Sequence, residues 1–441
     1  MKKKIIFLLL ILIVNISFLF SGPPDPVGPN SYCPHQYVRL NALMGVPVNC
    51  DEFVFIGAAV RPAYLIEQGF QRQNRPGYII LGTTIGYTIY YVLSPFHTTL
   101  KSFASKKLSG QFSAPELEKA VLYGSVYTGF ILINIVVLFL SMLLFEKSLL
   151  LATGEWKNSR WLLWICLAML ISNQVDKTFF WTAHQQMFTI FTPIACLYAG
   201  LTILNHPSSK RSSLITAFIS GLLLLVYGNF LLLLPVILFS YLLKLRKQKK
   251  QITGPVLLTI LTVIIIFFFP TAFWIACLRL TGVSYYNHEI SQFRHFVWIT
   301  DSLQHSAGFF FRQLLNNTTE FLKTSGSLLL SLLFLATAWL SLPQQSEKKA
   351  IIKTNQAQQV IKPILLVSML LFLLFLWSMG AYADRLTYSL APFLIFAAAC
   401  RINEKKLSIK NQWVIASLVF LIHLYTVFFN APHLSQKLFF Q

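Results

Sequence analysis

The sequence predicts an all-α, polytopic membrane protein with about eleven transmembrane helices and extracytoplasmic loops that carry interfacial helices. Of its 441 residues, 55% are hydrophobic and 12% are charged, and the mean hydropathy is +0.62. A soluble protein needs a far more polar surface than this composition supplies. Apolar runs recur between basic loops, and a bilayer core of about 30 Å needs about 20 apolar residues per helix.

The net charge of +21 lies in short loops between the apolar runs, as the positive-inside rule expects of cytoplasmic segments. This distribution argues against a nucleic-acid partner. The densest basic stretch is 244–250, with five basic residues in seven. We expect it to lie in the cytoplasm, together with Lys2, Lys3 and Lys4.

The first apolar run, residues 5–20, is either a retained anchor or a cleaved signal peptide. Ser21-Gly22-Pro23-Pro24 is a poor cleavage site, so we expect a retained anchor. Under both interpretations the chain from residue 21 onward lies outside.

Two later runs each admit two interpretations. Residues 77–96 contain four Tyr, four Thr or Ser and two further Gly, which favours a helix at the outer interface over a span. Residues 214–243 would measure about 45 Å as one helix, too long for a bilayer without strong tilt, so we expect a hairpin broken at 227–229. The expected spans are 5–20, 120–145, 161–172, 187–204, two within 214–243, 255–278, 327–342, 363–379, 386–399 and 413–429.

The basic residues support this topology, with the N-terminus inside and the C-terminus outside. Six short inside segments hold 21 of the 36 Lys and Arg, and the rest are spread over much longer outside loops. The predicted division is an anchor (1–20), a first extracytoplasmic loop with interfacial helices (21–119), spans two to seven (120–278), a long extracytoplasmic loop (279–325) and spans eight to eleven (326–441).

Polar motifs concentrate on the predicted outer face, where loops on a rigid bundle commonly carry function. The acidic pair Asp51-Glu52 lies in the first outside loop, and Arg75-Pro76-Gly77-Tyr78 opens the run at 77–96. Tyr227-Gly228-Asn229 interrupts a glycine-to-proline stretch at 221–235, and Arg385-Leu386-Thr387-Tyr388 precedes Pro392. In these places the chain resembles the GT-C superfamily of membrane glycosyltransferases, such as bacterial aminoarabinose transferases and protein mannosyltransferases.

The resemblance covers roughly the first 250 residues and a small part of the C-terminal third. It implies an enzyme that moves a sugar from a polyprenyl-phosphate carrier to a lipid, glycan or protein acceptor. It also implies membrane lipids as partners and a place in the bacterial cytoplasmic membrane, with the active face extracytoplasmic. The lipid-linked sugar would be a co-substrate, and no cofactor is assigned.

The chain departs from the family where many relatives carry a second acidic residue. His184-Gln185-Gln186 occupies that neighbourhood, and the nearest acid is Asp176. No metal site is therefore expected.

Glycosyl transfer needs a carboxylate to accept the acceptor's proton and cations to hold the departing lipid phosphate. Asp51 is the expected base, because an unshifted aspartate pKa near 3.9 keeps it ionised at neutral pH. Glu52 is the second candidate, since adjacent carboxylates raise each other's pKa. The alternative for this pair is a solvated loop without catalytic function.

Several other side chains are candidates for binding phosphate or sugar. Guanidinium groups present a planar fork that suits phosphate, although arginines at an interface also pair with lipid headgroups. Arg385 has Asp384 beside it as an alternative partner, His184 suits a hydrogen-bonding loop residue equally well, and 291–298 also fits an amphipathic interfacial helix. The candidates are Arg61, Arg72, Arg75, Tyr78, His184, Arg294 and Arg385.

Cys33 and Cys50 share the first outside loop, so an oxidising compartment would allow a disulfide between them. The remaining four cysteines lie within or at the ends of predicted spans and suit small apolar packing residues: Cys166, Cys196, Cys277 and Cys400.

The sequence contains no P-loop, no G-x-G-x-x-G, no H-E-x-x-H and no paired C-x-x-C, which disfavours nucleotide-driven pumps, dinucleotide enzymes and zinc proteases. Two alternatives to a glycosyltransferase remain. A surface-polysaccharide polymerase or ligase would rely on the loop at 279–325. A non-catalytic lipid or polysaccharide transporter would need ionisable groups along a path between the spans, which hold almost none.

Overall fold

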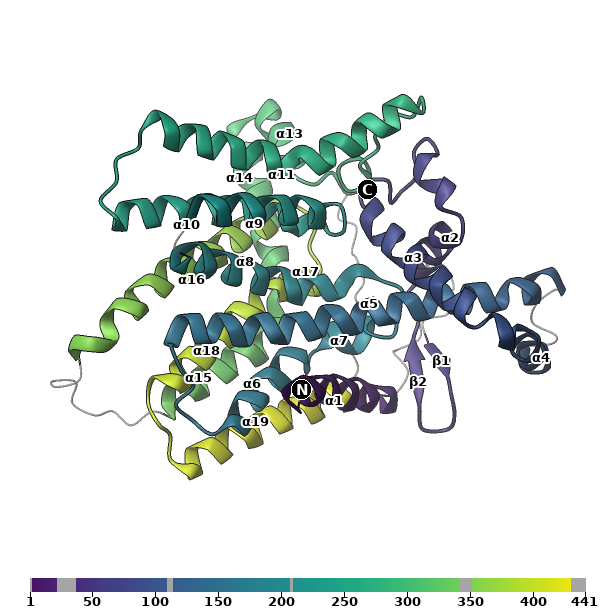
Figure 1. Cartoon of the computed structure of the whole chain (residues 1–441), viewed down its shortest axis with the longest axis horizontal. Coiled ribbons are helices and arrows are strands. Elements are labelled where there is room, and N and C mark those ends of the chain that lie inside the picture. The colour runs from purple at the N-terminus through teal and green to yellow at the C-terminus, as the bar shows by residue number, and fades with distance from the viewer. Residues whose placement is uncertain (1, 22–36, 109–113, 207–208, 342–350, 430–441) are drawn as a thin grey trace.

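A computed structural model describes residues 2–21, 37–108, 114–206, 209–341 and 351–429 (Figure 1). In these ranges the protein is almost entirely helical, which confirms the predicted all-α class. One antiparallel pair of short strands, β1 (Tyr37–Arg39) and β2 (Gly45–Pro47), precedes the second helix. The described helices are α1 (Lys2–Ser17), α2 (Cys50–Val60), α3 (Pro76–Val92), α4 (His97–Leu108), α5 (Ala114–Thr153), α6 (Arg160–Ile171), α7 (Gln174–Phe179), α8 (Phe188–Asn205), α9 (Ser209–Leu224), α10 (Leu233–Lys247), α11 (Gly254–Leu280), α12 (His288–Phe293), α13 (Val297–His305), α14 (Ala307–Lys323), α15 (Leu329–Leu340), α16 (Ile351–Ser378), α17 (Asp384–Thr387), α18 (Ala391–Glu404) and α19 (Ile409–Phe428).

Eight helical segments in the described ranges are long and apolar enough to cross a membrane, or nine if α3 and the bent helix that follows count as one. This is fewer than the eleven expected. The apolar helices Arg160–Ile171 and Lys362–Ser378 are shorter than the eight, and α9 has only 16 residues. The protein is therefore a polytopic helical membrane protein with at least eight candidate spans.

Two local predictions can be compared with the helices directly. The hairpin expected in 214–243 is present, because α9 ends at Leu224 and α10 begins at Leu233, with a 3-10 turn at Gly228–Leu232 between them. The segment 279–325, predicted to be a long outside loop, contains the helices α12, α13 and α14. Helix α14 runs into α15 through a 3-10 turn, so Ala307–Leu340 is a continuous helical stretch of 34 residues that contains an apolar window long enough for a span.

The interfacial helix that 291–298 suggested is not formed, because no single helix covers these residues. Helix α12 ends at Phe293, and Arg294 and Phe296 have left-handed backbone angles with φ of 50° and 63°. A right-handed helix cannot continue through such residues, so the chain turns sharply before α13.

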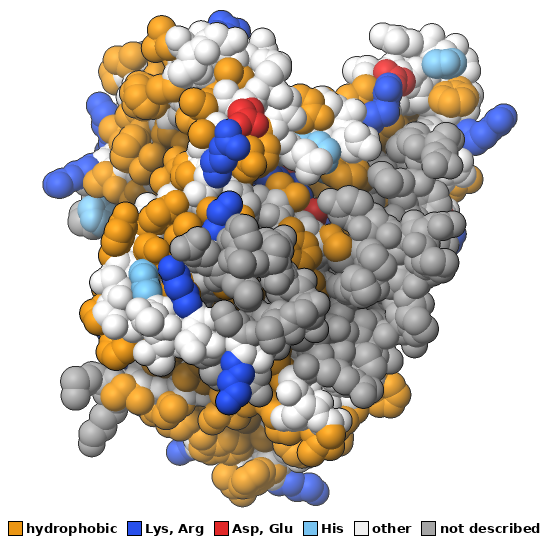
Figure 2. Space-filling model, turned by 90° about the vertical axis from the view of Figure 1, so that its right-hand side faces the viewer, with side chains coloured by type: hydrophobic (Ala, Val, Ile, Leu, Met, Phe, Trp, Pro, Cys, Tyr) orange, Lys and Arg blue, Asp and Glu red, His pale blue; other side chains and the backbone are white. Residues whose placement is uncertain are grey.

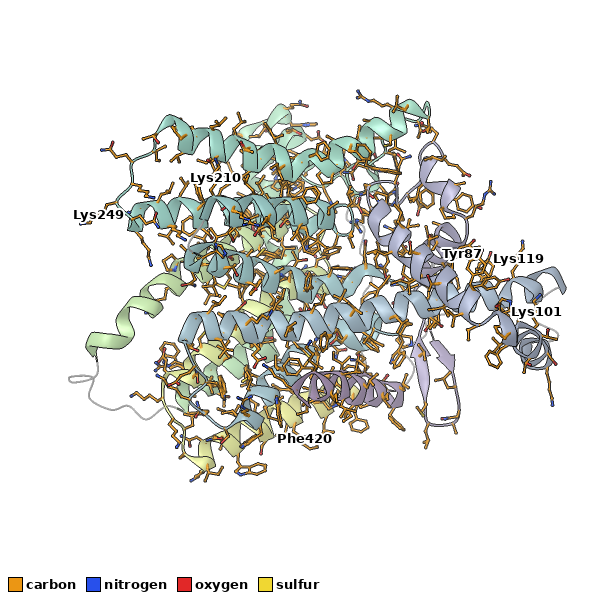
Figure 3. All side chains as sticks on the ribbon, in the orientation of Figure 1. Tyr87, Lys101, Lys119, Lys210, Lys249 and Phe420 are labelled. Atoms are coloured by element: carbon orange, nitrogen blue, oxygen red, sulfur yellow. The ribbon has the colours of Figure 1, made fainter. Side chains whose placement is uncertain are left out.

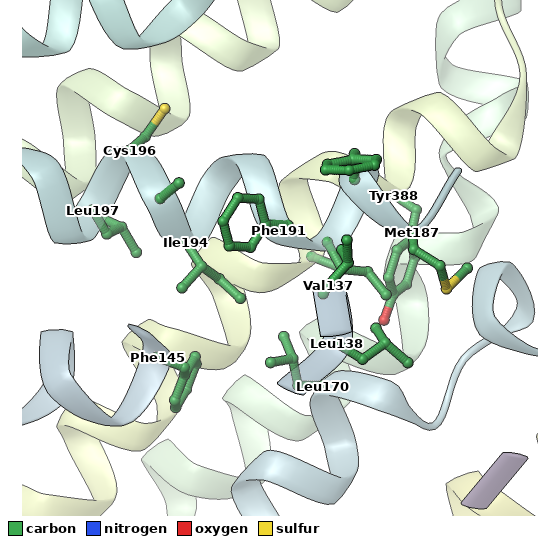
Figure 4. Packing of buried hydrophobic residues seen from close by; sticks show 14 of the residues in the cluster. Val137, Leu138, Phe145, Leu170, Met187, Phe191, Ile194, Cys196, Leu197 and Tyr388 are labelled. Carbon is green, nitrogen blue, oxygen red and sulfur yellow. The ribbon is translucent and has the colours of Figure 1, made fainter. Parts of the chain in front are cut away.

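Helices α1, α3, α8 and α18 pack against α5, which has 40 residues and is therefore about 60 Å long. In the core, Val137 and Leu138 of α5 pack near Leu170 of α6 and Phe191 of α8 (Figure 4). Helix α5 extends to the right-hand end of the molecule in Figure 1, where α3, α4 and the β-strands lie.

Helices α3 and α5 approach each other closely through glycine. A Cβ on Gly86 would lie 2.6 Å from the Cα atom of Val126, and one on Gly129 would lie 2.9 Å from the backbone nitrogen of Gly86. Small residues allow this kind of contact between membrane helices. The beginning of α3, next to Arg75, is held separately, because the backbone N–H of Gly77 donates to the backbone oxygen of Leu225 at 3.0 Å.

The basic segments predicted to be cytoplasmic come together at one end of the bundle. Lys3 pairs with Glu146 near the end of α5, and the amino group of Lys244 donates to the backbone oxygen of His206 at the end of α8. The Asn158 amide donates to the backbone oxygens of Ile402 (2.8 Å) and Lys405 (3.1 Å), which joins the loop after α5 to the loop after α18. Lys249 lies at this end, at the left of Figure 3.

We predict that Gly86→Ala destabilises the protein, because the added methyl group meets backbone atoms of α5 that cannot move aside. Overpacking of this kind costs about 1–3 kcal/mol. The measurement is thermal unfolding of the purified protein in detergent. Gly124→Ala is the matched control, since a Cβ at that position on α5 meets nothing within 4 Å. Equal unfolding temperatures for the two variants would contradict the packing account.

Candidate functional site

Asp51 and Glu52 occupy the first turn of α2, where a helix favours negative charge. Asn49 caps this helix, because its side-chain oxygen accepts a hydrogen bond from the backbone N–H of Asp51 at 2.9 Å. Successive residues of a helix point about 100° apart. The two adjacent carboxylates therefore enter different surroundings.

Asp51 lies between a guanidinium group and an imidazole ring. Its Oδ1 is 3.1 Å from Nη2 of Arg72, and its Oδ2 is 3.6 Å from Nε2 of His184. Burial alone would raise the pKa of Asp51. The adjacent His184 ring and the charges of Arg72 and Arg385 outweigh burial and hold that pKa well below its usual value. Asp51 is therefore ionised, and with a quarter of its side chain exposed it is accessible to a substrate.

Arg72 is almost fully buried, with a relative exposure of 7%, and its guanidinium group lies over the ring of Phe55 at 5.0 Å from the centroid. A buried cation needs a partner of opposite charge. The contact with Asp51 supplies that partner and joins α2 to the segment that leads into α3.

Arg75 pairs with Glu289 of α12, a residue that the sequence did not single out. The side-chain amide of Asn74 also donates to Glu289. The connection between α11 and α12 follows the same surface, because the backbone N–H of Tyr286 donates to the Gln73 side chain at 2.7 Å. Burial would raise the pKa of Glu289, but the adjacent Arg75 lowers it below its usual value, so this carboxylate is ionised.

Arg385 lies in the first turn of α17, with its guanidinium carbon 5.7 Å from the ring centroid of Phe179. No carboxylate of the described residues is within ion-pair distance of it, so the predicted alternative of a pair with Asp384 is wrong. Arg72 and Arg75 are near enough to affect it electrostatically, as is Asp51.

The cluster formed by Arg72, Arg75 and Arg385, called the arginine cluster below, carries more positive than negative charge. Three guanidinium groups face two ionised carboxylates, Asp51 and Glu289. The Nε atom of each arginine is buried and has no hydrogen-bond partner within the described ranges. Unpaired buried donors in a positively charged site favour the binding of an anion.

Glu52 turns away from the arginine cluster and is 6% exposed. One of its oxygens accepts a hydrogen bond from the backbone N–H of Ala183 at 3.2 Å. Burial raises the pKa of Glu52 to about 7, so the group is able to gain or lose a proton near neutral pH. The cause is burial, whereas the sequence suggested mutual repulsion of the two carboxylates.

Tyr78 was predicted to bind substrate, but the structure places it in the core. Its ring packs edge-on against Phe55 at 5.1 Å and tilted against Phe130 at 4.9 Å. The side chain is fully buried. Through Phe55 it packs against α2, the helix that carries Asp51 and Glu52, and it does not reach a surface.

Two predicted arginines lie outside the cluster. Arg61 is exposed and lies 3.7 Å from Glu67, and Arg294 is exposed and paired with Asp301. Both have their own partners at the surface, so the structure gives them no place beside Asp51.

Only one of the two cysteines predicted to form a disulfide lies within the described residues. Cys50 is disulfide-bonded, which places a covalent link next to Asp51, and Cys166, Cys196, Cys277 and Cys400 are free. Cys33, the predicted partner of Cys50, lies outside the described residues.

The described ranges contain no group of three or more His, Cys, Asp or Glu side chains that could hold a metal ion. Asp176 does not take the place of a second acid in the site. It is fully buried, neither of its carboxyl oxygens has a hydrogen-bond partner in the described part of the chain, and burial raises its pKa well above the usual value. We therefore treat it as neutral.

The sequence alone narrows the search for the carboxylate partner of Arg75 to three residues. The predicted outside loop 279–325 holds only three acidic residues, Glu289, Asp301 and Glu320. A buried arginine on the same face needs a carboxylate, and this short list would have included its partner. Nothing in the sequence distinguished Glu289 from the other two.

The end of the molecule that carries α3 and α4 is shown face-on in Figure 2. Lys and Arg side chains outnumber Asp and Glu side chains on this face, and hydrophobic side chains lie between them. Helix α8 connects this end of the bundle with the basic end. Gln186, just before α8, contacts Arg385 of the site, and His206, just after α8, contacts Lys244 of the basic stretch.

We predict that Glu52→Gln removes a pH dependence of stability. The folded-state pKa of Glu52, about 7, is above its unfolded value, so the folded protein binds this proton more tightly. Stability contributed by that proton is present at low pH and is lost as the pH rises from about 4.5 to about 7. The variant keeps the neutral form at every pH.

The unfolding temperature of Glu52→Gln should therefore exceed that of the wild type increasingly as the pH rises through this window. Glu67→Gln, at a half-exposed carboxylate, is the control. A constant difference between Glu52→Gln and the wild type across the window would show that Glu52 does not titrate there.

We compared the chain with known proteins. No protein-family model matches it, and no curated protein and no solved structure matches it either.

Proposed function

We propose that this protein is an integral membrane glycosyltransferase that moves a sugar from a polyprenyl-phosphate carrier to an acceptor outside the cytoplasmic membrane of a bacterium. One observation carries the proposal most strongly. An ionised, partly exposed Asp51 lies beside an arginine cluster with excess positive charge, at the end of the bundle opposite the basic loops. The resemblance of the Asp51-Glu52 and Arg75-Pro76 motifs to GT-C enzymes adds to it.

The proposed topology has eleven spans, with the short helices α6, α9 and the apolar part of α16 each crossing the membrane. Helix α3 lies at the outer interface. The contacts between the basic segments support this arrangement, because segments on one side of a membrane must meet at one end of the bundle. The positive-inside rule then assigns that end to the cytoplasm.

The chemistry follows from the positions of the charges. An acceptor hydroxyl or amine attacks the anomeric carbon of the sugar, and the bond from that carbon to the phosphate oxygen breaks. The electron pair of this bond leaves with the lipid phosphate, whose charge the arginine cluster stabilises. The proton of the acceptor passes to Asp51, which is the more exposed of the two carboxylates.

The low pKa of Asp51 makes it a weak base before the reaction begins. It accepts a hydrogen bond from the acceptor and takes the proton as the acceptor becomes acidic in the transition state. Glu52, with a pKa of about 7, is better matched to hold a proton but is less exposed. Separate mutations of Asp51 and Glu52 distinguish which of the two carboxylates accepts the proton of the acceptor.

A second candidate is a polymerase or ligase of surface polysaccharide. The loop after α11 supplies Glu289 to the site, as expected if that loop helps to hold a large acceptor. The product distinguishes the two functions. A glycosyltransferase adds single sugars from a lipid monophosphate, whereas a ligase transfers a preassembled chain.

We predict that Asp51→Asn abolishes transfer while the protein still inserts and folds. Loss of a general base lowers the rate by about 10²–10⁴-fold. The measurement is transfer from lipid-linked sugars in proteoliposomes, together with envelope glycans and lipid-linked intermediates of cells with and without each variant. Asp301→Asn, at an exposed carboxylate outside the site, should retain activity. Normal transfer by Asp51→Asn would remove Asp51 from the mechanism.

We also predict that Glu289→Gln tightens donor binding. Glu289 now neutralises Arg75 and competes with the donor phosphate for the guanidinium group. Its removal leaves a buried cation that needs another anion, so KM for the lipid-linked donor should fall by about tenfold. Glu320→Gln, whose carboxylate pairs with Lys323 on the exposed face of α14, is the control. A higher donor KM in Glu289→Gln would mean that Arg75 does not bind the phosphate.

A further inference from the structure

Four consecutive residues, Ala183 to Gln186, each contact a different member of the site. We call them the 183–186 segment. The Ala183 N–H donates to Glu52 at 3.2 Å, and His184 Nε2 is 3.6 Å from Asp51. These two contacts connect the segment to both acids of α2.

The two glutamines of the segment contact the arginines. The Gln185 amide satisfies its hydrogen bonds when its oxygen accepts from Nη1 of Arg75 and its nitrogen donates to the backbone oxygen of Val226 at 3.2 Å. The Gln186 side chain donates to the backbone oxygen of Arg385 at 3.2 Å. A stretch of four residues thus reaches both carboxylates of α2 and two of the three arginines.

Helix α5 holds the chain that leads into this segment. The Asn134 side chain donates to the backbone oxygens of Phe180 at 2.9 Å and Thr182 at 3.0 Å, and the Tyr127 hydroxyl donates to the backbone oxygen of Trp181 at 2.6 Å. All of these groups are buried or partly buried. The segment is therefore attached to the longest helix of the bundle.

The His184 ring is fixed by its neighbours. It packs against the ring of Phe179 at 4.9 Å and edge-on against Phe55 at 5.7 Å. Burial lowers the pKa of His184 to about 4, so at neutral pH the ring is uncharged and lies beside Asp51 as a neutral polar group. The groups that face Asp51 are Arg72, Arg385 and the His184 ring. His288 of α12 is also close enough to interact with Asp51 electrostatically.

The glutamines differ from carboxylates in one respect that matters for an anion site. An amide oxygen orients a guanidinium group, but it does not neutralise it. A glutamate at position 185 would form an ion pair with Arg75 and compete with phosphate. The absence of an acid at 184–186, where the resemblance to GT-C enzymes implies one, preserves the positive charge.

We propose that the 183–186 segment is the positioning element of the site: His184 orients the Asp51 carboxylate, and Gln185 orients the Arg75 guanidinium group without neutralising it. This inference rests on the proposed function, because it assigns Asp51 to the proton and Arg75 to the donor phosphate. It makes His184 and Gln185 positioning residues that act through their neighbours.

The kinetic test uses purified protein in proteoliposomes with a polyprenyl-phosphate-linked sugar as donor. Gln185→Leu should raise the donor KM by about tenfold with a small change in kcat, the effect of a lost hydrogen bond to a charged group. Gln185→Glu should raise KM at least as much, because it adds the competing charge. A purely structural acceptor role predicts near-normal KM for Gln185→Glu, and that result would overturn the proposal.

His184→Phe should lower kcat by about tenfold with little change in donor KM, and His184→Gln, which restores an N–H donor, should recover part of the loss. Gln412→Leu and His423→Phe change the same residue types on α19, away from the site, and should leave both parameters unchanged. No recovery in His184→Gln, or equal losses in the α19 variants, would contradict the positioning role.

A cycle of unfolding temperatures tests the contacts without any activity. Residues in contact give non-additive effects, whereas distant ones add. Gln185→Leu combined with Arg75→Leu should cost less than the sum of the two single changes, and Gln185→Leu with Gln412→Leu should add. If the protein transfers no sugar from any lipid-linked donor, the proposed function fails. An additive result for Gln185 with Arg75 overturns the positioning element, whatever the outcome for the proposed function.

Discussion

The contact between Asp51 and Arg72 is the interaction on which the rest of this site depends. Arg72 is too deeply buried to remain charged alone, and Asp51 is the carboxylate that compensates it. The contact fixes the start of α2 against the segment that enters α3. It also determines which of the two adjacent acids stays ionised, because Glu52 is turned into the core, where its charge has no cation beside it.

The remaining charges follow from the same requirement. Arg75 is compensated by Glu289, which lies in the first turn of α12. Arg385 has no such carboxylate. The site therefore holds one cation more than its ionised acids compensate, a balance that a bound phosphate would restore.

The sequence predicted the helices well where a physical signal was local. Apolar runs located the long helices, and Tyr227-Gly228-Asn229 located the hairpin, because glycine and a change in composition interrupt a helix within a few residues. The number of spans was less certain, since α6 and α9 are shorter than a bilayer requires. Their tilt and packing depend on neighbours that a linear pattern does not contain.

The site was predicted in part for the same reason. Asp51, Arg72, Arg75 and Arg385 come together as charge and motif suggested. The prediction that Tyr78 binds substrate was wrong because the sequence did not show which face of α3, the helix that begins at Pro76, points into the core. The roles of Glu289 and the 183–186 segment depend on contacts across more than a hundred residues of chain, which no local pattern records.

An experimental structure of the protein in a lipid nanodisc with polyprenyl phosphate tests the central claim most directly. The account predicts phosphate bound by Arg75 and Arg385, within reach of Asp51, with Glu289 displaced from Arg75. Phosphate bound at the opposite end of the bundle, beside Lys244 and the basic stretch at 244–250, with the Arg75–Glu289 pair intact, would contradict it.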